Sequence, residues 1–213
     1  MECTDKCRFC SILKREKKFG TIDTPILEEE NYYLLASIGA MIEGWSLVIP
    51  KKHEYSMKNY YSNSEFCDFV HKCINIIKSA YQVDKVIVFE HGANKFGSMT
   101  ACGTNHCHIH IVPMMDSLLD NIMEFVPFKK VLFEDVNEFV GDSEYLLYAD
   151  VYEQIFESDC YVHILEKPIS QFFRRIIATK LDCPDKYDYR ENANISISNA
   201  TFKTLQKEVE NGN

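Results

Sequence analysis

The sequence lacks long apolar runs, and this absence excludes the classes of protein that depend on them. No stretch reaches the roughly 18 apolar residues of a membrane helix, and the first residues, Met-Glu-Cys-Thr-Asp-Lys, lack the apolar core of a signal peptide, so we expect a cytoplasmic protein without membrane contact. Basic residues are in deficit, 23 against 32 acidic ones, and the net charge of −9 argues against an extended nucleic-acid partner. Repeats and low-complexity tracts are also absent, and 46% hydrophobic residues fit a folded globular protein.

Cysteine, in contrast, is abundant. The count of nine is odd and the positions are scattered, which is not typical of a disulfide framework. Cys7 and Cys10 have the spacing of a metal-ligand pair, and Cys3 lies nearby in the same polar segment. Two alternatives remain open at this point: a metal site or a pair of thiols that bind nothing.

The first 115 residues read as a mixed α+β unit. Segments 31–37, 45–50 and 85–90 are rich in branched and aromatic residues and predict strands, as does the alternating segment 106–113. Apolar residues recur at three- and four-residue spacing over 64–82, which predicts an amphipathic helix. The short loops favour an antiparallel sheet with flanking helices over a parallel, doubly wound one.

The remainder of the chain predicts a C-terminal α/β extension. Strands are expected at 144–151 and 161–165, and Pro168 is expected to open a helix that runs to residue 178. The polar tail is expected to end in a frayed helix over the last dozen residues. We therefore divide the chain into a domain at 1–128 and an extension at 129–213, which share one core.

Three histidines carry the clearest chemical signal. His106, His108 and His110 alternate along a predicted strand, so they share one face with Cβ atoms roughly 6.5–7 Å apart from one to the next. The residues between them point to the core. Histidines on a solvated sheet face are one interpretation. Two others involve chemistry: all three imidazoles bind one catalytic metal, or one imidazole attacks phosphorus while its neighbour supports the phosphate oxygens. The intervening core residues are Cys107, Ile109 and Ile111.

Taken together, three motifs resemble the histidine-triad (HIT) superfamily of nucleotide hydrolases and transferases. They are the triad itself, the segment Leu-Val-Ile-Pro-Lys-Lys-His at 47–53 and the Cys-x-x-Cys start, in the family's order over about residues 5–115. The resemblance implies cleavage at the α-phosphate of a nucleoside phosphate derivative through a covalent nucleotidyl-histidine. His108 would be the nucleophile and His110 would contact the phosphate. Because His110 is histidine rather than the glutamine of the uridylyltransferase branch, the resemblance favours a hydrolase, with a nucleotidyltransferase left open.

The resemblance also implies a zinc site. In the zinc-bearing branches, the ligand set carries over to Cys7, Cys10, His53 and His106. Two thiolates and two imidazoles complete a tetrahedron without an open position, which is typical of structural zinc.

The expected nucleotide-binding residues depart in part from the family pattern. Ser37, followed by Ile38, takes the place of the acidic residue that contacts ribose in many members. Trp45, which we expect to pack in the core, follows Gly44 where the family has histidine. His91 is expected on the pocket rim. Backbone N–H groups of Gly103 and Thr104 are expected to cradle phosphate.

The helix expected between Pro168 and residue 178 offers two further candidates, Gln171 and Arg174. We expect them on a face that closes over the nucleotide. A surface helix with salt bridges is the alternative. Two other functions stay open for the whole chain: a non-catalytic nucleotide-binding or adaptor protein, and a three-histidine metallohydrolase. Many HIT proteins are dimers, so a homodimer is a further open alternative, and neither the base nor the leaving group follows from the sequence.

Overall fold

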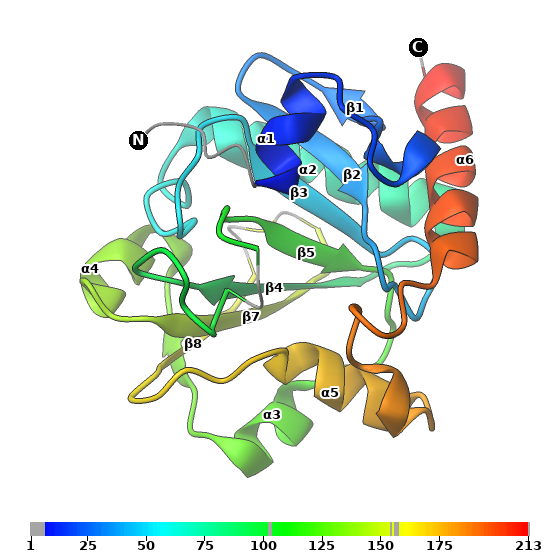
Figure 1. Cartoon of the computed structure of the whole chain (residues 1–213). Coiled ribbons are helices and arrows are strands. Elements are labelled where there is room, and N and C mark those ends of the chain that lie inside the picture. Colours follow the sequence, from blue (N-terminus) through cyan, green and yellow to red (C-terminus); the bar gives the residue numbers. More distant parts are fainter. Residues whose placement is uncertain (1–6, 102–103, 154, 156–157, 213) are drawn as a thin grey trace.

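A single antiparallel sheet organises the protein. The computed structural model describes residues 7–101, 104–153, 155 and 158–212. Its eight strands follow the spatial order β1-β2-β3-β5-β4-β7-β8-β6 (Figure 1). The predicted α+β class with flanking helices is thus confirmed. The strands are β1 (Leu27–Glu28), β2 (Tyr32–Ala36), β3 (Ser46–Pro50), β4 (Val86–Gly92), β5 (Ile109–Val112), β6 (Lys129–Val131), β7 (Tyr145–Val151) and β8 (Cys160–Ile164).

One face of the sheet is covered continuously. Helices α2 (Ser64–Tyr81), α4 (Val136–Val140) and α6 (Ile195–Asn211) pack there against inward-facing aliphatic residues of the strands. The N-terminus of α2 is capped by the side chain of Asn63, which accepts from the Phe66 N–H. This layer contains the largest apolar cluster among the described residues.

The opposite face is covered in two separate places. Helix α1 (Arg8–Leu13) packs on β2 and β3, whereas α3 (Leu119–Phe125) and α5 (Phe172–Lys180) pack towards β4 and β7. The apolar residues under α1 form a cluster distinct from the one under α3 and α5. The candidate site lies between these two clusters. Short 3-10 turns at Gly20–Asp23, Phe133–Asp135 and Pro184–Lys186 complete the fold.

Three predicted elements differ from those observed. Strand β5 begins at Ile109 rather than residue 106, because the Cys107 N–H donates to the Glu54 carbonyl outside the sheet. Helix α5 begins at Phe172 rather than near Pro168, since Gln171 has φ 56°, a left-handed conformation that helices exclude.

The C-terminal tail differs most. In place of a frayed end, α6 runs for 17 residues and packs against α2 and β2. Two polar bonds fix it to the connection between β2 and β3: Ser198 Oγ donates to the Ser37 carbonyl at 2.7 Å, and Gly44 N donates to Thr201 Oγ1 at 2.9 Å. Burial of Phe202 and Leu205 accounts for its stability.

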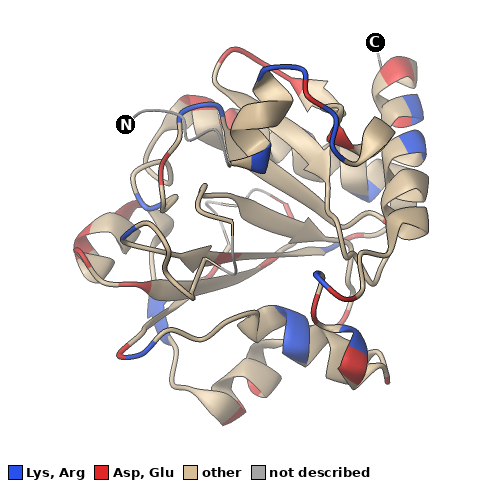
Figure 2. Ribbon diagram, viewed as in Figure 1, with Lys and Arg blue, Asp and Glu red and all other residues tan. Residues whose placement is uncertain are grey.

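The expected boundary near residue 128 falls between α3 and β6, and strands on both sides of it share the sheet. Strand β7 pairs with β4 over seven residue pairs, from Val86–Val151 to Gly92–Tyr145. Figure 2 shows the strands mostly free of charged residues, which gather on the surrounding helices and loops. Among the described helices, none has the length and apolar character needed to cross a bilayer.

Candidate active site and metal centre

A cluster of four buried ligands joins the N-terminal segment to the sheet. One potential ligand atom from each of Cys7, Cys10, His53 and His106 lies within 4.8 Å of the others. Cys7 Sγ lies 3.4 Å from His106 Nδ1, and Cys10 Sγ lies 3.3 Å from His53 Nδ1 and 3.6 Å from His106 Nδ1. These four residues are placed to hold one metal ion.

The donor set fits zinc. A tetrahedron with bonds of about 2.0–2.3 Å has edges of roughly 3.3–3.8 Å, and the three measured sulfur–nitrogen separations fall in that range. His106 Nε2 contacts the Pro50 carbonyl at 2.7 Å, which requires the proton on Nε2 and leaves the Nδ1 lone pair facing the sulfurs. Burial lowers the pKa of His106 to about 4, so its imidazole is neutral and able to bind a cation.

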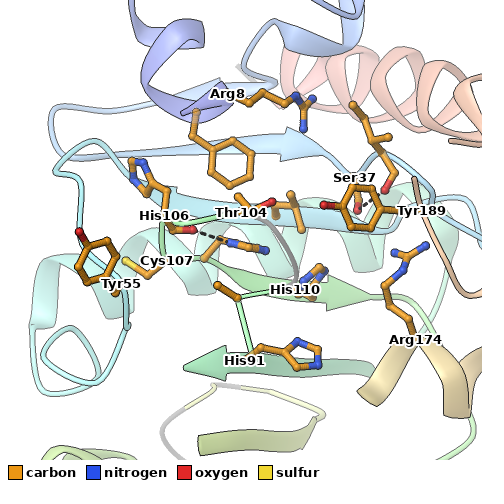
Figure 3. A pocket seen from close by; sticks show the side chains of 15 residues that line it. Arg8, Ser37, Tyr55, His91, Thr104, His106, Cys107, His110, Arg174 and Tyr189 are labelled. Carbon is orange, nitrogen blue, oxygen red and sulfur yellow. Dashed lines mark hydrogen bonds between the residues drawn. The ribbon is translucent and has the colours of Figure 1, made fainter. Parts of the chain in front are cut away.

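The triad pocket lies beside this cluster, between α1 and α5 (Figure 3). Arg8 and Phe9 of α1 border it on one side, and Arg174 of α5 borders it on the other. Strand residues, together with the histidine directly before β5, form the floor. Figure 3 shows side chains from both termini of the chain around the central histidines. The floor includes Leu47, His91, His108 and His110, and further lining comes from Ser37, Ile38, Tyr55, Ala101, Thr104, His106, Cys107 and Tyr189.

The ring of His108 has a defined orientation. Its Nδ1 lies 2.9 Å from the His106 carbonyl, and because a carbonyl only accepts, Nδ1 carries the proton (Figure 3). The lone pair of Nε2 is then available as a nucleophile. Burial lowers the pKa of His108 to about 4, and the neutral imidazole is therefore the form present near pH 7. Its ring and the Phe9 ring form a T-shaped contact, with centroids 5.3 Å apart.

His110 is held by aromatic neighbours. Trp45 Nε1 donates to its Nδ1 at 2.9 Å, and Phe89 stacks on its ring with centroids 4.4 Å apart. The ring of His108 lies 4.9 Å away. Burial, together with repulsion from His108, His91 and Arg174, lowers the pKa of His110 well below its usual range.

His91 lies on the pocket floor beside the triad. The centroid of its ring is 5.2 Å from that of Phe173. Its Nε2 is buried and has no hydrogen-bond partner among the described residues. Burial lowers its pKa to about 3, and His108 and Arg174 add to this effect. An unpartnered nitrogen in this place could bond a bound ligand.

The structure brings to the other rim of the pocket only some of the residues that were expected to contact the nucleotide. Ser37 and Ile38 line the pocket, and Ser37 Oγ donates to the Ile38 carbonyl at 3.3 Å. Thr104 also lines it, but its N–H donates to the Ala101 carbonyl at 2.9 Å. The backbone N–H of Thr104, which was expected to bind phosphate, is therefore already hydrogen-bonded within the protein. Gly103 lies outside the described residues.

Arg174 borders the pocket, but its guanidinium already makes several contacts within the protein. Its Nε donates to the Tyr187 carbonyl at 2.8 Å, its Nη2 donates to the Gly39 carbonyl, and its guanidinium lies over the Trp45 ring, 4.8 Å from the centroid. Gln171 is not among the residues that line the pocket. Its Oε1 accepts from the Tyr189 N–H at 3.4 Å, so it supports the loop behind the wall.

Sequence reasoning missed several contributors to the site, among them Arg8, Phe9, Tyr55, Tyr189 and the Trp45 hydrogen bond. Arg8 lies inside the Cys-x-x-Cys motif, which places it beside the pocket whenever the two cysteines meet the triad. The indole of Trp45 replaces a polar residue of the family pattern, and this replacement was a signal that its N–H needs a polar partner. No local signal marked Tyr55 or Tyr189.

Comparison with known proteins identifies a relative of the chain. The chain is 30% identical over 135 residues to an uncharacterized HIT-like protein of Methanocaldococcus jannaschii, an overlap of 62% of this chain and 94% of that protein. The chain belongs to the HIT-like family. No family model matches it.

Solved structures resemble it more distantly. A protein of Streptococcus mutans has 20% identity and a TM-score of 0.43, with 54% of this chain and 69% of that one covered. A hypothetical histidine triad nucleotide-binding protein of Sulfolobus tokodaii has 23% identity and a TM-score of 0.38, with 52% and 70% covered.

Proposed function

We propose that this HIT-like protein is a nucleotide hydrolase, or a nucleotidyltransferase, that acts at the α-phosphate of a nucleoside phosphate derivative. The observation that carries the proposal is the orientation of His108, whose Nδ1 proton is bound to the His106 carbonyl while its Nε2 is left for the substrate. His110 lies beside it with its own Nδ1 occupied by Trp45. A nucleophile and a hydrogen-bond donor thus stand side by side on one pocket floor.

In the proposed reaction, the His108 Nε2 lone pair forms a bond to the α-phosphorus. The bond from phosphorus to the leaving group breaks, and its electron pair departs with that group. Water or another acceptor then attacks the same phosphorus, the nitrogen–phosphorus bond breaks, and the acceptor's proton passes to solvent. His110 donates from Nε2 to a phosphoryl oxygen in both steps.

Zinc would not take part in these bonds. Cys7, Cys10, His53 and His106 would hold it in a closed site, where it would tie α1 to the ends of β3 and β5. This placement matters for the pocket because Arg8 and Phe9 follow the first cysteine directly and line the site.

The alternative of a three-histidine metallohydrolase is not favoured by the geometry. His106 uses Nε2 for the Pro50 carbonyl and turns Nδ1 towards the cysteine sulfurs, so neither nitrogen is left to join His108 and His110 around a second ion. A non-catalytic nucleotide-binding protein is the remaining alternative. It would share the pocket and lack turnover.

A substrate panel tests the proposal. Purified protein is incubated with dinucleoside polyphosphates, nucleoside phosphoramidates, nucleotide sugars and acyl-adenylates, and release of nucleoside monophosphate is followed by chromatography. Turnover of at least one class, abolished in His108→Ala, supports the proposal. Nucleoside monophosphate binding without turnover of any class would assign the protein to the non-catalytic alternative.

A further inference from the structure

Trp45 is the single tryptophan of the chain, and it is fully buried beside the triad. It lies directly before β3, and its Nε1 donates to His110 Nδ1 at 2.9 Å. A buried indole N–H requires a partner, and here the partner is a triad imidazole rather than a carbonyl.

This bond has only one possible polarity. An indole N–H donates and never accepts, so His110 Nδ1 must be the acceptor and its proton must reside on Nε2. A hydroxyl or a second histidine in the same place could reverse its role. With tryptophan the tautomer cannot alternate.

Neighbouring groups hold the indole in place. Phe89 meets the Trp45 ring edge to face at 5.8 Å and stacks on His110 at 4.4 Å. From the other side the Arg174 guanidinium lies over the indole at 4.8 Å. Arg174 belongs to α5. This helix is therefore linked to His110 of the triad through Trp45.

We infer that Trp45 is a positioning residue that locks His110 as a neutral imidazole with Nε2–H available to the substrate. The inference rests on the proposed function for its catalytic meaning. The lock makes His110 a fixed hydrogen-bond donor rather than an acid that gains and loses a proton during turnover.

Protonation of His110 would place two N–H groups against each other at the Trp45 contact. The charged groups that face His110 also oppose a cation there: Arg174 from α5, and His108 and His91 when protonated. The site therefore favours leaving groups that depart as stable anions, such as phosphates of a phosphoanhydride, over amines that need a proton to depart.

The test uses nuclear magnetic resonance on the full-length, zinc-loaded, 15N-labelled chain. Because there is one tryptophan, its indole signal needs no mutant for assignment. We expect a correlation through the hydrogen bond between the Trp45 indole nitrogen and His110 Nδ1, and a proton on His110 Nε2 that persists from pH 8 to pH 5.5. A proton on Nδ1, or a His110 cation above pH 6, would overturn the inference.

Trp45→Phe keeps an aromatic ring and removes the N–H, so His110 should become protonated at higher pH than in the wild type. Tyr148→Phe is the matched control, because Tyr148 belongs to the same apolar cluster and loses a buried bond to the Leu118 N–H. An equal change in the control, or none in Trp45→Phe, would contradict the inference.

Kinetics add a separate readout. We expect the ratio of kcat/KM for diadenosine triphosphate to kcat/KM for adenosine phosphoramidate to fall by about tenfold or more in Trp45→Phe, because general acid catalysis by the released imidazole contributes 10²–10⁴-fold. An unchanged ratio would contradict the role in specificity. If the wild type turns over neither these two compounds nor any other class of the substrate panel, the proposed function fails while the tautomer result stands on its own.

Discussion

Each histidine of the triad uses its two ring nitrogens differently. His106 bonds the Pro50 carbonyl through Nε2, His108 bonds the His106 carbonyl through Nδ1, and His110 accepts from Trp45 at Nδ1. The alternating sequence pattern predicted the three imidazoles on one face, and the family resemblance assigned His106 to a metal site and the other two to the nucleotide. The structure places His106 in the cluster with the two cysteines and His53, and it places His108 and His110 in the pocket.

Glu90 is a second buried residue with unusual surroundings, on the opposite face of β4. Its carboxylate accepts from the Met57 N–H at 2.7 Å and from the hydroxyls of Tyr61 and Tyr145 at 2.6 and 2.5 Å. Burial nevertheless raises its pKa to about 7, since the three donors offset only part of the desolvation. The folded protein therefore holds this proton more tightly than the unfolded chain does.

Stability should consequently fall as pH rises through this window. Between an ordinary pKa near 4.5 and about 7, the unfolded chain releases the proton first, so the free energy of unfolding decreases with pH. Glu90→Gln removes this titration. We expect the wild type to lose up to about 3 kcal/mol relative to the variant from pH 4.5 to pH 8 in urea unfolding.

The exposed Glu65 serves as control, and Glu65→Gln should show no such relative change. A gap between wild type and Glu90→Gln that stays constant with pH would contradict the raised pKa.

At the scale of elements, hydrophobic periodicity predicted those helices and strands whose bounds depend on the face that they bury. Helix 64–82 and the strands at 31–37, 45–50 and 85–90 match α2, β2, β3 and β4 within two residues, because their apolar spacing matches the face that they bury. The starts of β5 and α5 depend on a distant carbonyl and on a left-handed residue, neither of which has a periodic signal. The zinc ligands and His108 were expected from family resemblance, whereas the Trp45 bond depends on tertiary packing.

Helix α6 shows how a polar segment can still be structural. Ile195, Ser198, Phe202, Leu205 and Val209 recur at three- and four-residue spacing, and this narrow stripe faces α2 and β2. Its mostly polar composition hid the pattern.

We expect Leu205→Ala to destabilise the protein by about 2–5 kcal/mol, because Leu205 is fully buried and its truncation leaves a cavity. Chemical denaturation measures the change. Lys203→Ala, at an exposed position of the same helix, should change stability by less than about 0.5 kcal/mol. Equal stability of the wild type and Leu205→Ala would show that α6 is not part of the cooperative core.

At the scale of the whole molecule, segments from both ends of the chain meet over the sheet. Helix α1 carries Arg8 and Phe9 to one side of the pocket, and the segment from α5 to residue 193 carries Arg174 and Tyr189 to the other. The four residues placed to hold a metal ion bring α1 together with segments that adjoin β3 and β5. Loss of the metal should therefore disturb one pocket wall as well as stability.

Cys7→Ser tests this link. We expect it to release zinc and lower the melting temperature, because binding energy in structural zinc sites, about 10–16 kcal/mol in small zinc peptides, contributes directly to folding. Metal content is measured by mass spectrometry and unfolding by calorimetry. Cys183→Ser, at a partly buried cysteine outside the cluster, should retain the metal. Wild-type protein without stoichiometric zinc, or a Cys7→Ser variant that keeps both zinc and stability, would contradict the assignment.

The most direct test of the proposed chemistry is to trap the covalent intermediate. Protein is mixed rapidly with a substrate that the panel identifies, quenched in alkali because a phosphorus–nitrogen bond to histidine is acid-labile, and digested for peptide mass spectrometry. We predict a nucleotidyl adduct on His108, and its loss in His108→Ala with a fall in kcat of several orders of magnitude and with folding retained. An adduct on another residue, or normal turnover by His108→Ala, would contradict the account.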